Sequence, residues 1–136
     1  TRSLCDWSSD GVLFRSMELI STYICKTSDI GVNHNLFGGT MLSWLDEAGG
    51  IMAASECRSN NVITLKMEEV LFKKPVKVKE TVRVYGRVEH VGHTSITLYI
   101  EARTVNLENR SEVIVCSTRM IFVNIDDDGK PKHINK

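Results

Sequence analysis

Residues 39–56 form a long stretch of this sequence whose apolar side chains repeat with the period of an α-helix. At 100° per residue, six small or apolar residues gather on one stripe of that helix. They are Met41, Leu42, Leu45, Ala48, Gly49 and Met52. An apolar stripe needs a surface that buries it, and the chain after residue 60 has the period of β-strands instead. The sequence therefore predicts a fold in which a β-sheet covers one long helix.

The segments after residue 60 alternate apolar and polar side chains, which is typical of half-buried strands. We predict strands at about 63–72, 82–88, 96–102 and 114–122, and one more before the helix at about 18–26. A phase shift at Glu69 and Val70 predicts a β-bulge. Because no other segment is apolar enough to bury the helix, an antiparallel sheet must cover one of its faces. The predicted fold class is α+β, with a single domain over residues 1–136 and a core at about 12–125.

Charge and cysteine content exclude several kinds of partner. Lys plus Arg and Asp plus Glu each number 17, so the formal net charge is zero. A neutral chain is not expected to bind nucleic acid or an anionic membrane, and no stretch approaches the roughly 20 apolar residues that span a bilayer. The cysteines have no CxxC or zinc spacing, so we expect reduced, mostly buried thiols, no bound metal and a cytoplasmic location. They are Cys5, Cys25, Cys57 and Cys116.

The start of the predicted helix carries features that a catalyst could use. Gly38 and Gly39 lie where backbone N–H groups are unpaired and carry partial positive charge, and glycine lets another group come close to them. Asp46 follows about two turns later, at the edge of the apolar stripe. A carbonyl bound to those N–H groups could be attacked by a water that Asp46 activates. The alternative is tight packing at the glycines and a solvated surface aspartate.

The same region resembles the hotdog-fold acyl-CoA thioesterases of the acyl-CoA hydrolase branch. The motifs that carry the resemblance are Asn33, Phe37-Gly38-Gly39, Trp44-Leu45-Asp46-Glu47-Ala48, Phe72-Lys73-Lys74-Pro75-Val76 and Gly92-His93-Thr94-Ser95. The resemblance extends from about Asp29 to Val123 and implies a long central helix wrapped by a curved antiparallel sheet. It implies hydrolysis of fatty acyl-CoA to free CoA and a carboxylate, with the CoA thioester as substrate and no cofactor. Many members have His where this chain has Phe37.

The resemblance also implies catalytic roles for individual residues. Asp46 matches the family's catalytic carboxylate, which acts as general base or, less often, as nucleophile. Asn33 matches a catalytic-site asparagine that reaches the site from the partner chain of a dimer. Gly39, with Gly38 beside it, matches the position whose backbone amide polarises the thioester carbonyl. Members of this branch are commonly trimers of dimers, so we expect a homodimer at minimum and a hexamer as the full assembly.

Substrate contacts are expected on both sides of the thioester. The resemblance implies that the loop with Thr94 and Ser95 lines the pantetheine side of the site. The CoA phosphates need cations, and the candidates by placement are Lys73, Lys74, Arg87, Arg103 and Arg119, although each one alone could be an ordinary exposed charge. The predicted substrate-binding residues are Phe37, Lys73, Lys74, His93, Thr94, Ser95 and Arg119.

Two other functions remain open, because a fold alone does not fix function. A non-catalytic acyl-CoA sensor would bind CoA esters tightly without turning them over. A dehydratase acting on 3-hydroxyacyl-CoA would favour a catalytic His in the loop before the helix, where His34 is the sole candidate and no motif supports it. Release of a free thiol is expected of the thioesterase alone.

Overall fold

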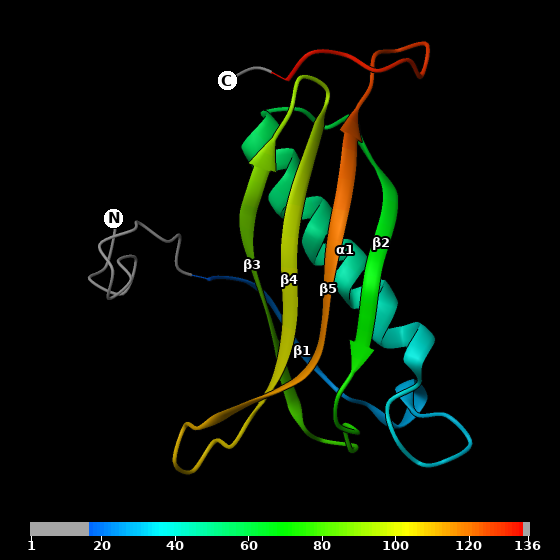
Figure 1. Cartoon of the computed structure of the whole chain (residues 1–136). Coiled ribbons are helices and arrows are strands. Elements are labelled where there is room, and N and C mark those ends of the chain that lie inside the picture. The colour runs from blue at the N-terminus through cyan, green and yellow to red at the C-terminus, as the bar shows by residue number, and fades with distance from the viewer. Residues whose placement is uncertain (1–16, 135–136) are drawn as a thin grey trace.

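The computed structural model describes residues 17–134, and the predicted helix and strands are all present in that range (Figure 1). A short 3₁₀ turn at Thr27–Asp29 separates the first strand from the helix. The elements are β1 (Glu18–Ile24), α1 (Gly38–Cys57), β2 (Val62–Phe72), β3 (Thr81–Val91), β4 (Ser95–Val105) and β5 (Glu112–Asn124). Their order along the chain confirms the α+β layout expected from the sequence.

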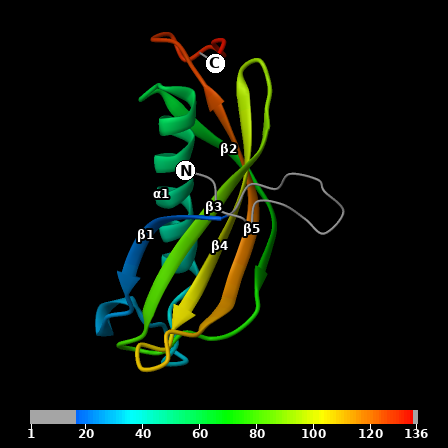
Figure 2. The same ribbon diagram turned by 90° about the vertical axis from the view of Figure 1, so that its left-hand side faces the viewer.

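The five strands form one antiparallel sheet in the order β1-β3-β4-β5-β2. The sheet curves around α1, and the helix lies along one face of it (Figures 1 and 2). The helix contacts all five strands. Within the described residues, β1 and β2 form the two edges of the sheet. A long helix wrapped by a curved antiparallel sheet is the arrangement that the sequence predicted.

The apolar stripe of α1 packs against the sheet as expected. Leu45 and Ala48 are fully buried, and Met41 and Met52 are nearly so. A Cβ atom on Gly49 would lie 2.9 Å from the sulfur of Met120 and 3.0 Å from the ring of Phe122. The helix can therefore approach β5 this closely because residue 49 has no side chain.

Strand β2 is an edge strand with an interrupted register. Its pairing with β5 shifts between Glu68 and Leu71, and Glu69 has a φ of 50°. This irregularity confirms the bulge predicted at Glu69 and Val70. Four large apolar side chains of β2 are about half exposed, namely Ile63, Leu65, Leu71 and Phe72. Strand β2 thus has both unpaired backbone groups and an exposed apolar surface at the edge of the described sheet.

The described cysteines are free thiols, which confirms that part of the prediction. Cys25, Cys57 and Cys116 are buried, and burial raises the pKa of Cys116 to about 11, so its thiol is unreactive at neutral pH. Cys5 and residues 12–16 of the predicted core lie outside the described residues. At the other end of the chain, Ile134 is buried in the same core. No helix within residues 17–134 is long and apolar enough to cross a membrane.

Candidate active site

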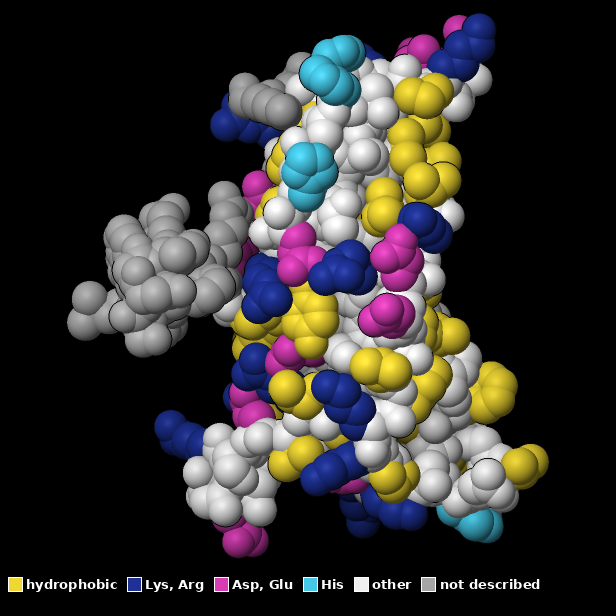
Figure 3. Space-filling view, viewed as in Figure 1, with side chains coloured by type: hydrophobic (Ala, Val, Ile, Leu, Met, Phe, Trp, Pro, Cys, Tyr) yellow, Lys and Arg dark blue, Asp and Glu magenta, His cyan; other side chains and the backbone are white. Residues whose placement is uncertain are grey.

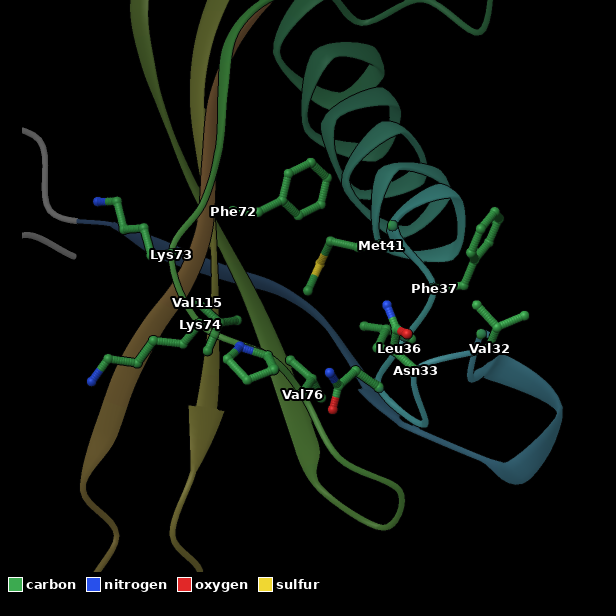
Figure 4. A pocket seen from close by; sticks show the side chains of 14 residues that line it. Val32, Asn33, Leu36, Phe37, Met41, Phe72, Lys73, Lys74, Val76 and Val115 are labelled. Atoms are coloured by element: carbon green, nitrogen blue, oxygen red, sulfur yellow. The ribbon is translucent and has the colours of Figure 1, made fainter.

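A cavity of about 540 Å³ opens beside the first turn of α1 (Figure 4). Its walls come from the loop at residues 31–38, from Met41, from residues 72–76 at the end of β2, and from Val115. Most of the lining side chains are apolar: Val32, Leu36, Phe37, Met41, Phe72, Pro75, Val76 and Val115. The polar ones are Asn33, Asn35, Lys73 and Lys74. The structure therefore gathers five of the predicted site residues, Asn33, Phe37, Gly38, Lys73 and Lys74, around one cavity.

The helix begins at this cavity without a polar cap. The N-cap residue is Phe37, whose phenyl ring has no atom that could accept a hydrogen bond from the first-turn N–H groups. Gly38 lines the cavity, so no side chain separates its backbone from that space. Gly39 lies under Phe37, since a Cβ atom there would be 2.7 Å from the ring. The helix start thus keeps backbone donors that a ligand oxygen could use.

Hydrogen bonds fix the loop before the helix against the segment after β2. The Leu36 N–H donates to the Val76 carbonyl over 2.8 Å. The Lys77 ammonium donates to the Asn35 side-chain oxygen over 2.5 Å. Both contacts join the two segments that line the cavity, so the fold holds these segments beside each other.

Asp46 lies on the side of α1 that faces β2. Its carboxylate is exposed and accepts a hydrogen bond from the Thr64 hydroxyl, with 2.5 Å between the oxygens. The next residue, Glu47, points toward β1 instead and accepts a hydrogen bond from the Tyr23 hydroxyl. The Tyr23 ring stacks on Trp44 with 4.6 Å between centroids. Two adjacent carboxylates of the same helix therefore have different surroundings, and Asp46 is the one at the β2 edge.

Thr64 is a candidate site residue that the sequence did not indicate. It stands 18 positions after Asp46 on another element, so its contact depends on the packing of β2 against α1. A threonine in an alternating strand is common, and nothing in the local pattern marks this one. Its position is the one sequence signal that could have indicated it. Thr64 is a polar residue on the strand that directly follows the helix with the candidate carboxylate.

The cationic side chains predicted to bind the CoA phosphates differ in whether they already form an ion pair with a carboxylate. Lys73 and Lys74 border the cavity and form no ion pair with any residue in the range 17–134. The arginines are paired on the outer face of the sheet, where both signs of charge intermingle (Figure 3): Arg87 and Arg119 with Glu89, and Arg103 with Glu101 and Glu112. The hydrogen bond to Glu89 raises the pKa of Arg119. Among the predicted cations, the two lysines therefore carry free positive charge at the cavity, and the Lys77 ammonium on the neutral Asn35 side chain adds a third cation beside it.

The predicted pantetheine loop lies elsewhere in the chain. His93 and Thr94 lie in the turn between β3 and β4, and Ser95 begins β4; this turn is at the C-terminal end of α1 (Figure 1). None of the three residues lines the cavity. The His93 ring packs edge-on against His133, and the His93 carbonyl accepts a hydrogen bond from the Ile134 N–H over 2.8 Å. One chain does not bring this loop to the cavity, so its contact with substrate stays a prediction that needs a second chain. No group of three or more His, Cys, Asp or Glu residues within 17–134 is placed to hold a metal ion.

Comparison with known proteins identifies the family. A family model described as the thioesterase superfamily matches residues 33–111, which include the loop, α1 and the segment after β2. The chain belongs to the thioesterase superfamily. A Bacillus subtilis relative named as an uncharacterized acyl-CoA thioester hydrolase is 32% identical over 126 residues, covering 85% of this chain and 73% of the relative.

Solved structures of superfamily members agree with the hotdog fold of this chain. A hexameric hotdog-fold thioesterase of Campylobacter jejuni superposes with a TM-score of 0.79 at 32% identity, covering 87% of this chain and 90% of that one. An acyl-CoA hydrolase from Staphylococcus aureus, solved in complex with butyryl-coenzyme A, gives a TM-score of 0.79 at 27% identity over 84% and 69% of the two chains. The Staphylococcus enzyme has also been solved as alanine variants of an asparagine, a threonine and an aspartate.

Proposed function

We propose that this protein is an acyl-CoA thioesterase that hydrolyses fatty acyl-CoA to free CoA and a carboxylate. The observation that carries the proposal is the uncapped start of α1 beside an apolar cavity, with Asp46 two turns further along the same helix. The names of the relatives, which are acyl-CoA thioester hydrolases, support it. The proposal includes the cytoplasmic location expected from the sequence.

The proposed chemistry uses backbone and carboxylate together. The thioester oxygen accepts hydrogen bonds from the N–H groups at Gly38 and Gly39, which stabilise the negative charge that develops on it. Asp46 takes a proton from a water molecule as that water attacks the carbonyl carbon. The tetrahedral intermediate then expels CoA as a thiolate, which takes the proton held by Asp46 and so restores the Asp46 carboxylate. Asp46 stands seven residues after Gly39, about 10 Å along the helix axis.

A second chain completes the proposed site. Asn33 lies at the cavity, and its proposed role is to hold water or substrate in the site of the partner chain. The exposed apolar side chains and unpaired edge of β2 offer a surface for that partner, next to Thr64 and Asp46. We propose a homodimer as the smallest active unit and a hexamer as the assembly, in line with the hexameric Campylobacter relative.

The two lysines beside the cavity give the proposal a charge-dependent prediction. The double variant Lys73→Ala, Lys74→Ala should raise KM for acyl-CoA about tenfold at low salt, because the phosphates lose their free cations. The difference should shrink as salt screens the charges of the unaltered protein. Steady-state kinetics at two ionic strengths would measure it. Arg119→Ala is the matched control, since Arg119 is already paired with Glu89, and an equal effect there would contradict the assignment.

Release of free thiol from acyl-CoA tests the proposed function directly. The assay follows a chromogenic thiol reagent with acetyl-, octanoyl-, palmitoyl- and benzoyl-CoA as substrates. We expect turnover of at least one fatty acyl ester. Tight binding of these esters by calorimetry without thiol release from any of them would establish the sensor in place of the thioesterase.

A further inference from the structure

The cavity beside α1 has an interior suited to a hydrocarbon chain. Met41, Val76 and Val115 are at most 4% exposed and form fixed parts of its wall. Figure 4 shows the side chains of Met41 and Phe72 directed into the space, while Lys73 and Lys74 extend away from it. Charged groups therefore stay outside, and the part of a ligand that enters meets mainly carbon atoms.

Several polar groups of the wall are already paired, whereas the Asn33 side chain and the Gly38 N–H at the helix start have no partner within residues 17–134. The Val76 carbonyl accepts from the Leu36 N–H, and the Val115 carbonyl accepts from the N–H groups of Lys73 and Lys74 at 2.8 and 3.3 Å. The side-chain oxygen of Asn35 is bound to Lys77. A pantetheine arm would bring two amide groups, and burying each amide without a partner costs about 1–3 kcal/mol on the scale of protein mutations. An aliphatic chain has no such requirement.

We infer that this cavity holds the acyl group of the substrate, and that it makes the enzyme selective for longer aliphatic chains over acetyl. The inference rests on the proposed function and adds the substrate class. A volume of about 540 Å³ corresponds to roughly 18 water-sized groups of about 30 Å³ each. An octanoyl group fits inside with room for adjustment, whereas an acetyl group leaves most of the apolar wall without contact.

Phe72 and Val76 are the residues that set this selectivity. The Phe72 ring is 57% exposed and would lie 3.7 Å from a Cβ atom on Gly38, so it covers the cavity next to the helix start. Val76 forms the wall beside Leu36. A chain whose carbonyl lies at Gly38 would pass between these two side chains, with about fourfold in binding expected for each methylene that becomes buried.

The test measures kcat/KM for octanoyl-CoA relative to acetyl-CoA. We expect this ratio to exceed ten in the unaltered protein and to fall at least tenfold in Val76→Phe, whose larger ring fills the cavity. Leu107→Phe is the matched control, because Leu107 lies outside the cavity lining, in the turn between β4 and β5 away from β2, and is 68% exposed. Circular dichroism and thermal melting check the fold. If Val76→Phe does not fold, Phe72→Ala with Leu107→Ala as control makes the same comparison, with the same fall expected.

The outcomes separate this inference from the function on which it rests. Absence of thiol release from every ester would count against the thioesterase itself. An active, folded Val76→Phe or Phe72→Ala protein that keeps the octanoyl-to-acetyl ratio would overturn the acyl assignment alone. Calorimetry on the Asp46→Asn variant measures binding without turnover. We expect this variant to bind octanoyl-CoA at least tenfold more tightly than free CoA. Adding Val76→Phe to the variant should remove this difference in affinity. Equal binding of the two ligands by Asp46→Asn would also overturn it.

Discussion

Replacing Asp46 by Asn should lower kcat for thioester hydrolysis by about 10²- to 10⁴-fold, because an amide cannot take a proton from the attacking water. The replacement has nearly the same size, and its amide oxygen can still accept the hydrogen bond from Thr64. Since residue 46 is exposed, the fold and the assembly should survive. Steady-state thiol release, with gel filtration to check the assembly, measures both quantities.

The matched control for this variant is Glu47→Gln. Glu47 is the neighbouring carboxylate of α1, but it faces β1 and is bonded to Tyr23. We expect kcat within about twofold of the unaltered protein, because an exposed surface carboxylate away from the reacting atoms contributes little. Near-full activity of Asp46→Asn would falsify the general-base role. An equal loss in both variants would point to a general effect of charge on the helix.

Local patterns in the sequence were sufficient to predict the elements of this fold. The helix stripe that includes Leu45 and Ala48 faces the sheet, because apolar residues that repeat with the helical period lie on one side of the helix and are buried together. The alternating strands follow from the two-residue period in the same way. Even the bulge near Glu69 could be located, because one extra residue reverses the phase of apolar and polar side chains.

Contacts between elements could not be predicted in the same way. The bond from Thr64 to Asp46 depends on how the edge strand β2 packs against α1, and β2 itself shifts register against β5 after Thr64. Whether the Arg119 side chain is free to bind a phosphate depends on Glu89, which is 30 residues away on another strand. A sequence can indicate a cationic side chain near a strand end, but only the sheet register shows whether a carboxylate already forms an ion pair with it.

The separation of the predicted substrate residues has a topological reason. The glycines at the start of α1 and the turn between β3 and β4 lie at opposite ends of the helix, which is 20 residues or about 30 Å long. Both could contact one CoA ester if a second chain brings its own turn beside the start of α1 in the first, outside the cavity proposed for the acyl group. The exposed edge of β2 leaves room for such a chain beside Thr64. The sequence alone could name these residues but could not show that they lie at opposite ends of α1.

Replacing Thr64 by Val should lower kcat about 10- to 100-fold with little change in KM. The hydroxyl of Thr64 is the described group that holds the Asp46 carboxylate, and a hydrogen bond to a charged group typically contributes about 1.5–3 kcal/mol. Valine keeps the branched shape that suits an edge strand, so the variant removes the bond without removing the packing. Without it, the carboxylate can adopt other rotamers and holds the attacking water in the required position less often.

Thr64→Ser separates this positioning role from a general effect on β2. Serine keeps the hydroxyl and loses only a methyl group, so we expect it to restore kcat to within about threefold of the unaltered protein. If the strand's packing were the important factor, serine should be the more damaging replacement, because it has lower β-propensity than valine. In the double variant Thr64→Val, Asp46→Asn, the loss should be no larger than in Asp46→Asn alone, since a group that acts through Asp46 has nothing left to position. Additive losses in that cycle would show that Thr64 acts on the substrate by a separate route.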